Sequence, residues 1–407
     1  MKNVYKLLAA LCLCMGLVSC SDSHPAPLTP LTPLESSSSG SIAGNETVVP
    51  DSIDTADMAQ SDVYSLPGVG LFKLINSPGM VIYTDQSQGA TLAYVNKTTR
   101  NSFYFCFDPT CSHYDCPANI LHLTNNMVYC NGKLYAVCPE PERGGGGTSL
   151  YSVNLDSTDL HKCYTSDGNE IYNPLVWNNT ILFSQGRTDG GEDLIAYDTK
   201  SGKTSVISDR YELDIGTYFA ARDAIYYTFI GDTYLYRTND FFETSEKLFD
   251  IEKMSNRLYG DQTHLYGVEY VRDDTGVVYA GRIVRCSLET GDMEVVYDGH
   301  GEPLNFVGID DDCCYFSYTI QAKTPYKRSD GAPIVNPSGG VLYRIPKSGG
   351  DEEVIMNDID YDISYVGKIG DDLYVLGHKY YDRGSVGGSK TMTGILNGGT
   401  VKEITPR

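Results

Sequence analysis

The residue types and segments that this chain lacks exclude several classes of protein. Its 407 residues hold 31 Lys and Arg against 53 Asp and Glu, and only one Trp. This excess of negative charge repels the phosphates of nucleic acids, and we therefore exclude nucleic acid as a partner. Nor does the chain have an apolar run long enough to cross a hydrocarbon core of about 30 Å as a helix, and we expect no transmembrane helix.

Common enzyme motifs are missing as well. The sequence contains no Gly-x-Ser-x-Gly elbow, no His-Glu-x-x-His pair and no Walker phosphate loop. Beyond the first twenty residues, no segment keeps an apolar period of 3.6, so helices should be few. These absences favour a binding protein over an enzyme.

The first twenty residues are typical of an export signal. Lys2 and Lys6 precede the apolar stretch 7–17, and the next residues end in Val-Ser-Cys at Cys20. This pattern resembles the bacterial lipobox, in which the Cys is acylated and becomes the first mature residue. We predict a lipoprotein signal peptide at 1–19 and an anchor at Cys20 that holds the protein on the outer side of the bacterial cell membrane. An ordinary signal peptide with a chance Cys is the alternative.

A tether follows the signal. Residues 20–61 are rich in Ser, Pro and Thr, a composition that cannot bury a core and predicts a disordered linker.

Of the 12 Cys, three lie within the first twenty residues, which leaves nine for the folded part. In an oxidising compartment such cysteines are first interpreted as disulfides. Since nine is odd, at least one must have another role.

One hairpin pattern recurs along the remaining chain. A short apolar strand, a tight turn of Asn, Gly or Asp, and a second strand rich in Tyr, Val and Ile form the unit. Its seven copies lie at 74–83, 127–137, 175–183, 218–227, 257–266, 305–316 and 364–375. A third and a fourth strand follow each copy.

Four antiparallel strands per repeat are typical of propeller blades. We therefore predict an all-β fold in which 62–407 forms a single seven-bladed β-propeller of four-stranded antiparallel blades. Two β-sandwich domains are the alternative. For ring closure, we expect 62–66 to pair with the last blade.

The third strands carry Leu-Tyr-Arg or Leu-Tyr-Ser, for example at 150–152, 235–237 and 342–344. This outer hairpin resembles the propellers of low-density-lipoprotein-receptor-related proteins, and exported bacterial lipoproteins of uncharacterised function carry a similar domain. The resemblance covers about 62–407. Since the blades lack a Tyr-Trp-Thr-Asp signature, it implies the fold and not the ligands of those receptors.

The densest group of reactive side chains is Cys106, Cys111, His113 and Cys116, within the sequence Cys-Phe-Asp-Pro-Thr-Cys-Ser-His-Tyr-Asp-Cys-Pro. Several of the similar lipoproteins carry such a cluster beside an early blade. In an exported protein we favour a disulfide clasp that pins an insertion between the first two blades. A Zn²⁺ site and a redox role are the alternatives.

Other features are less specific. The acidic pairs at 273–274, 310–312 and 371–372 are possible Ca²⁺ ligands, although such runs are more often solvated turns. Cys313 and Cys314 should point to opposite faces of one strand. The longest insertions are candidate ligand-facing loops: 106–118, 139–148, 321–339 and 378–391.

Together these observations predict a membrane-tethered, extracytoplasmic propeller that binds a glycan, a peptide or a partner protein. One alternative is an enzyme that acts on polysaccharide or cell-wall material. A second is a metal- or thiol-handling protein that uses the cluster from Cys106 to Cys116. We expect no cofactor beyond the Zn²⁺ or Ca²⁺ considered above.

Overall fold

The computed structural model describes residues 64–65 and 74–406 of the chain. Within the second range it leaves out 86–90, 109, 113–115, 122–125, 140–146, 167–168, 208–214, 222–223, 255–257, 273, 275, 277, 319–339, 359 and 381–388. The predicted signal peptide and tether therefore lie outside the described residues, whereas 64–65 belong to the predicted propeller. No helix in the part of the chain that is described is long and apolar enough to span a membrane.

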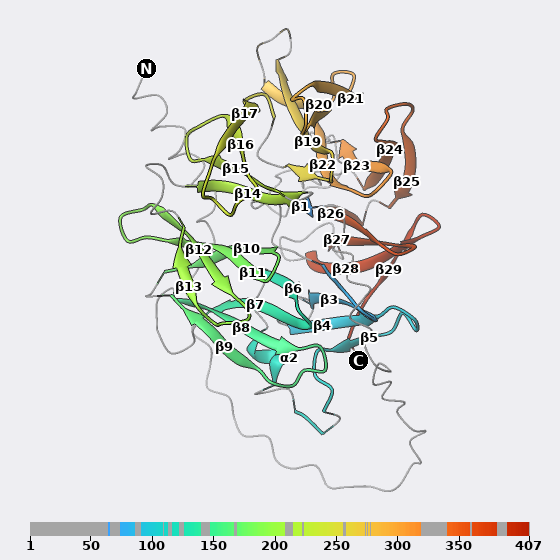
Figure 1. Cartoon of the computed structure of the whole chain (residues 1–407). Coiled ribbons are helices and arrows are strands. Elements are labelled where there is room, and N and C mark those ends of the chain that lie inside the picture. The colour runs from blue at the N-terminus through green and yellow to red at the C-terminus, as the bar shows by residue number, and fades with distance from the viewer. Residues whose placement is uncertain are drawn as a thin grey trace, which may run out of the picture. The chain divides into compact units, whose positions relative to one another are not determined.

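The described residues form seven antiparallel sheets, one per predicted repeat (Figure 1). Blades 1 and 2 consist of β2 (Ile75–Ser77), β3 (Met80–Asp85), β4 (Thr91–Asn96) and β5 (Ser102–Tyr104), then β6 (Met127–Cys130), β7 (Lys133–Pro139), β8 (Thr148–Asn154) and β9 (His161–Thr165). Blades 3 and 4 consist of β10 (Ile171–Trp177), β11 (Thr180–Gly186), β12 (Glu192–Asp198) and β13 (Thr204–Val206), then β14 (Ile215–Ala221), β15 (Ala224–Phe229), β16 (Tyr234–Thr238) and β17 (Glu246–Asp250).

Blades 5 to 7 continue the same order. Blade 5 consists of β18 (Tyr259–Gly260), β19 (His264–Arg272), β20 (Val278–Ser287) and β21 (Met293–Asp298), and blade 6 of β22 (Leu304–Ile309), β23 (Cys313–Tyr318), β24 (Val341–Pro346) and β25 (Glu353–Asn357). Blade 7 consists of β26 (Tyr361–Ile369), β27 (Asp372–Tyr380), β28 (Ser389–Asn397) and β29 (Thr400–Glu403). The prediction of a seven-bladed propeller is confirmed, and α2 (Pro117–Ile120) is the helix of the described residues.

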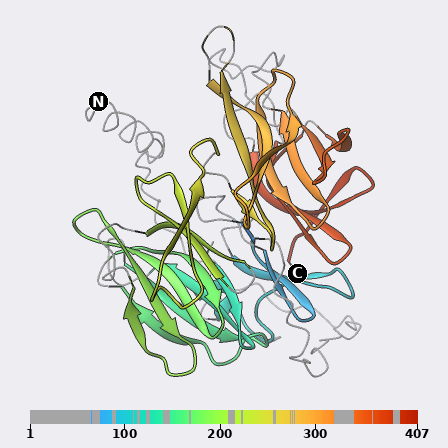
Figure 2. The ribbon, with the colours of Figure 1, turned by 45° about the horizontal axis from the view of Figure 1, so that its top comes forward.

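Strand alternation lets each blade pack on two neighbours. Successive residues of a strand point to opposite faces. In β3, Ile82 faces blade 2 and Val81 faces blade 7, and both are fully buried. Seven clusters of buried apolar residues result, one between each pair of neighbouring blades. The core of the propeller is thus a ring of inter-blade layers, and in Figure 2 blade 7 (red) returns to blade 1 (blue).

Ring closure differs from the sequence prediction. The segment 62–66 contains β1 (Tyr64–Ser65), which pairs with the inner edge of β18 in blade 5 and not with the last blade. Blade 7 already has four strands of its own, so β29 fills the outer position that a strand shared for ring closure would take. The innermost strand of blade 5 offers a free edge instead, since backbone donors and acceptors at an edge accept another strand.

The two edges of the propeller differ in how its strands are joined. First and second strands are joined by only two or three residues, as at 131–132 and 261–263. Second and third strands are joined by longer segments, the longest being 319–340 between β23 and β24. In an antiparallel meander all these second-to-third joins leave the same side of the ring, which we call the loop edge. Three of the four predicted ligand-facing loops, 139–148, 321–339 and 378–391, join second and third strands.

Candidate functional site

The predicted cysteine cluster lies between blades 1 and 2. The chain leaves β5 at Tyr104, and Phe105, Cys116 and Leu121 are buried in the apolar cluster shared by these two blades. Cys106 and Cys111 are half-buried against the same cluster. The predicted location beside the first two blades is therefore confirmed.

Local hydrogen bonds shape this segment. The Asp108 carboxylate accepts from the backbone N–H of Thr110 at 2.8 Å and from its hydroxyl at 2.7 Å. The N–H of Cys111 donates to the Asp108 carbonyl at 3.2 Å, which turns the chain back toward Cys106. The N–H of Phe107 donates to the Ser157 hydroxyl at 3.0 Å, and this bond attaches the segment to a turn of blade 2.

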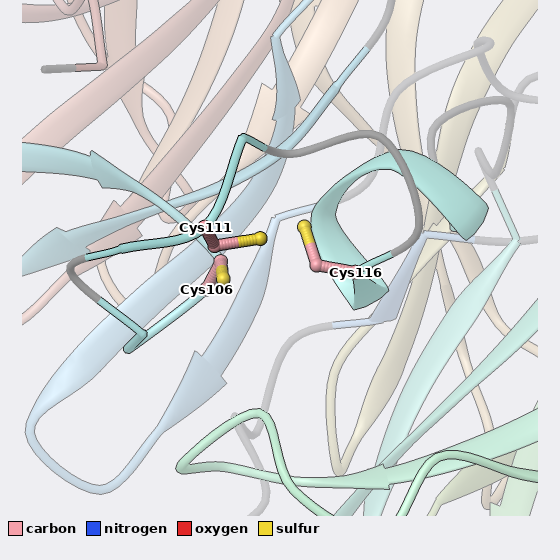
Figure 3. Close-up of side chains that lie close together, drawn as sticks. All are labelled: Cys106, Cys111 and Cys116. Atoms are coloured by element: carbon pink, nitrogen blue, oxygen red, sulfur yellow. The ribbon is translucent and has the colours of Figure 1, made fainter.

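Three thiols converge at this place. The Sγ atoms of Cys106, Cys111 and Cys116 all lie within 4.8 Å of one another (Figure 3). Burial, together with the two neighbouring thiols, raises the pKa of Cys106 to about 12. A thiol with so high a pKa carries little thiolate at neutral pH and is a poor nucleophile. His113, the fourth residue of the predicted cluster, lies outside the described residues.

The other cysteines fill inter-blade layers. Cys314 is buried between blades 5 and 6, whereas Cys313 packs on the layer between blades 6 and 7. Their predicted opposite orientation is therefore confirmed. Among the described cysteines the structure contains no disulfide, and the predicted clasp stays a prediction.

The acidic turns mainly organise the backbone. One oxygen of Asp310 accepts from the N–H groups of Asp312 and Cys313 at 2.9 and 2.7 Å, and the other accepts from the Tyr315 hydroxyl at 2.7 Å. Asp372 pairs with Arg100 at 2.9 Å. These contacts explain the carboxylates as turn and inter-blade anchors, and calcium binding stays a prediction.

The loop edge carries exposed apolar side chains that the sequence did not predict. Strands β19 and β20 pair as far as Arg272 and Val278, well beyond the predicted second strand at 264–266. On this extension Tyr270 is 56% exposed and Val278 is 52% exposed. Ile230, in the corresponding join of the neighbouring blade 4, is 50% exposed. We call these three residues the loop-edge patch. The signal that could have revealed the longer strand is Val-Glu-Tyr-Val at 268–271, since β-branched and aromatic residues are typical of strands.

Comparisons with known proteins concern the fold of the chain. No protein-family model matches the chain, and no curated protein matches it. Pyrococcus horikoshii acylaminoacyl peptidase is 13% identical with a TM-score of 0.50, and the match covers 84% of this chain and 52% of that one. The β-propeller domain of the Trilobed protease from Pyrococcus furiosus is 13% identical with a TM-score of 0.49, over 82% of this chain and 97% of that one.

A chain of the nidogen–laminin complex is 11% identical with a TM-score of 0.38, over 63% of this chain and 90% of that one. This chain spans about half the length of the peptidase and nearly all of the Trilobed protease domain. At such identities the peptidase match shows the propeller fold alone.

Proposed function

We propose that the protein is a lipid-anchored, extracytoplasmic propeller that binds a glycan, a peptide or a partner protein at its loop edge. The observation that carries this proposal is the loop-edge patch of Ile230, Tyr270 and Val278. Large apolar side chains cost free energy when they face water, so three of them in the second-to-third joins of neighbouring blades favour a contact surface. Tyr in particular offers a rigid, amphipathic contact area.

Charged side chains lie on the same pair of strands. Arg282 contacts Asp298 at 2.9 Å and Glu269, the residue before Tyr270, at 3.4 Å. Binding surfaces commonly combine an apolar centre with polar and charged groups around it. Complete burial of one such side chain contributes about 1.5–3 kcal/mol, so three half-exposed side chains can support affinity that point mutations reveal.

A binding screen tests this proposal. The full chain, purified in detergent, is applied to glycan and peptide arrays, and hits are compared with the double variant Tyr270→Ser/Val278→Ser. We expect the double variant to lose at least about tenfold in affinity, which corresponds to about 1.4 kcal/mol. The matched control is Val354→Ser, an exposed residue on the outer strand β25. Equal losses in both variants, or turnover of a polysaccharide with no binding, would contradict the proposal.

The anchor is tested separately. Replacement Cys20→Ala removes the only thiol of the predicted lipobox. We expect the wild-type chain to incorporate a labelled fatty acid and to sediment with membranes, and the variant to do neither. A wild-type chain that is secreted without label would mean that the signal is an ordinary one.

A further inference from the structure

We propose that Cys106, Cys111 and Cys116 together bind one thiophilic d¹⁰ cation, Zn²⁺ or Cu⁺, which fixes the link between blades 1 and 2. The geometry of the thiols supports the site, since three sulfur atoms lie within 4.8 Å of one another beside the layer between blades 1 and 2. The proposal is independent of the loop-edge patch, which lies on blades 4 and 5.

The distances suit a shared cation. Zn–S bonds of about 2.3 Å in tetrahedral geometry separate neighbouring sulfurs by about 3.8 Å. The three Sγ atoms, at no more than 4.8 Å, therefore need to close by about 1 Å at most, which small side-chain rotations provide. A disulfide brings two sulfurs to about 2.05 Å and leaves the third thiol unused. A cation uses all three.

Each sulfur is positioned by a different local structure. Cys106 follows the end of β5, Cys111 lies at the end of the turn organised by Asp108, and Cys116 precedes α2. Although Cys116 occupies the cap position of that helix, its side chain makes no capping hydrogen bond. In Figure 3 the sulfurs of Cys111 and Cys116 face each other, one from the turn and one from the start of the helix.

The donor set selects the class of metal. Thiolates are soft ligands that favour Zn²⁺ and Cu⁺ over Mg²⁺ or Ca²⁺. Binding converts three thiols to thiolates, so one cation enters and three protons leave, with no change in oxidation state. The surrounding layer is apolar in its described residues, so it offers the cation no competing hard ligand.

The test is metal binding by the full chain, reduced and purified in detergent. Co²⁺ serves as the spectroscopic probe, Zn²⁺ displaces it, and a separate titration uses Cu⁺. We expect one equivalent of Co²⁺ with a thiolate-to-metal charge-transfer band that Zn²⁺ abolishes. Comparison of the Zn²⁺ and Cu⁺ affinities then assigns the metal. Absence of a stoichiometric band together with no tight Cu⁺ binding would overturn the proposal.

Variants locate the site. Cys106→Ser, Cys111→Ser and Cys116→Ser should each reduce metal affinity at least a hundredfold, whereas the control Cys286→Ser, in the layer between blades 4 and 5, should not. Binding that survives any of the first three changes would overturn the proposal. If the variants do not fold, alkylation of the wild-type chain decides: Zn²⁺ should protect these three cysteines together. Protection of other cysteines, or a disulfide between two of the three in the exported protein, would refute it.

Discussion

Blade 1 packs against its two neighbours very differently. Among the described residues, its layer with blade 2 contains fifteen buried apolar residues, some of them from α2 and the cysteine segment, whereas its layer with blade 7 contains seven. The same strand supplies both layers, since Ile82 and Val81 are successive residues of β3. The two sides therefore differ through what the neighbouring segments add and not through the strand itself.

The difference concerns how the ring is held closed. In the described part of the chain, β26–β29 and β2–β5 form two separate four-stranded sheets, and no strand is shared between blades 7 and 1. Closure rests on the smaller apolar layer and on the ion pair between Arg100 and Asp372. Buried apolar area is the main stabilising term in such layers. We infer that this seam opens more readily than the layer between blades 1 and 2.

The largest effect is expected in the larger layer. Phe105 is fully buried and contacts the rings of Tyr94 and Phe107. Its replacement Phe105→Ala removes this packing and leaves a cavity, which costs about 3–5 kcal/mol of unfolding free energy. Urea unfolding followed by tyrosine fluorescence measures the loss. A cost below about 1 kcal/mol would show that the cysteine segment and blade 1 are not tightly joined.

A second comparison concerns the polar contacts between blades. Asp261, in a turn of blade 5, pairs with Lys347 of blade 6 at 2.7 Å, and both side chains are largely buried. Burial alone raises the pKa of Asp261, but Lys347 and the N–H groups of Thr263 and His264 outweigh it and lower that pKa to about 2. The ordinary value is about 3.9.

The lowered pKa of Asp261 predicts how the stability of the protein depends on pH. A lowered folded-state pKa stabilises the protein fully above the ordinary pKa, and the contribution disappears as pH falls from about 4 to about 2. A pKa shift of about two units corresponds to about 2–3 kcal/mol of unfolding free energy. Asp261→Asn should therefore lose about that amount at pH 7, and the gap between wild type and variant should narrow below pH 4. A gap that stays constant between pH 5 and pH 2.5 in urea unfolding would refute this assignment.

Much of this architecture could be predicted from sequence because it repeats. The Asn, Gly and Asp turns and the Tyr-rich strands are local signals, and each of the seven hairpins falls where they place it. The partner of β1 could not be predicted, because the sequence of a short strand indicates that it forms a strand but not which sheet edge it pairs with. Convergence of Cys106, Cys111 and Cys116 was partly predictable from spacing. The loop-edge patch was not, since Tyr270 and Val278 meet only through the long pairing of β19 with β20.

The smallest effect is expected at the closing seam. Arg100 contacts Asp372 at 2.9 Å from the turn between the third and fourth strands of blade 1, and its side chain is 55% exposed. Water and salt screen such a pair, so Arg100→Ala should cost less than about 1 kcal/mol. A double-mutant cycle with Asp372→Ala measures the coupling, and added salt should reduce it further. Coupling as strong as that between Asp261 and Lys347 would mean that the seam is closed mainly by charge. Weak coupling would leave the apolar residues around Val81 and Tyr374 as the contact that closes the ring.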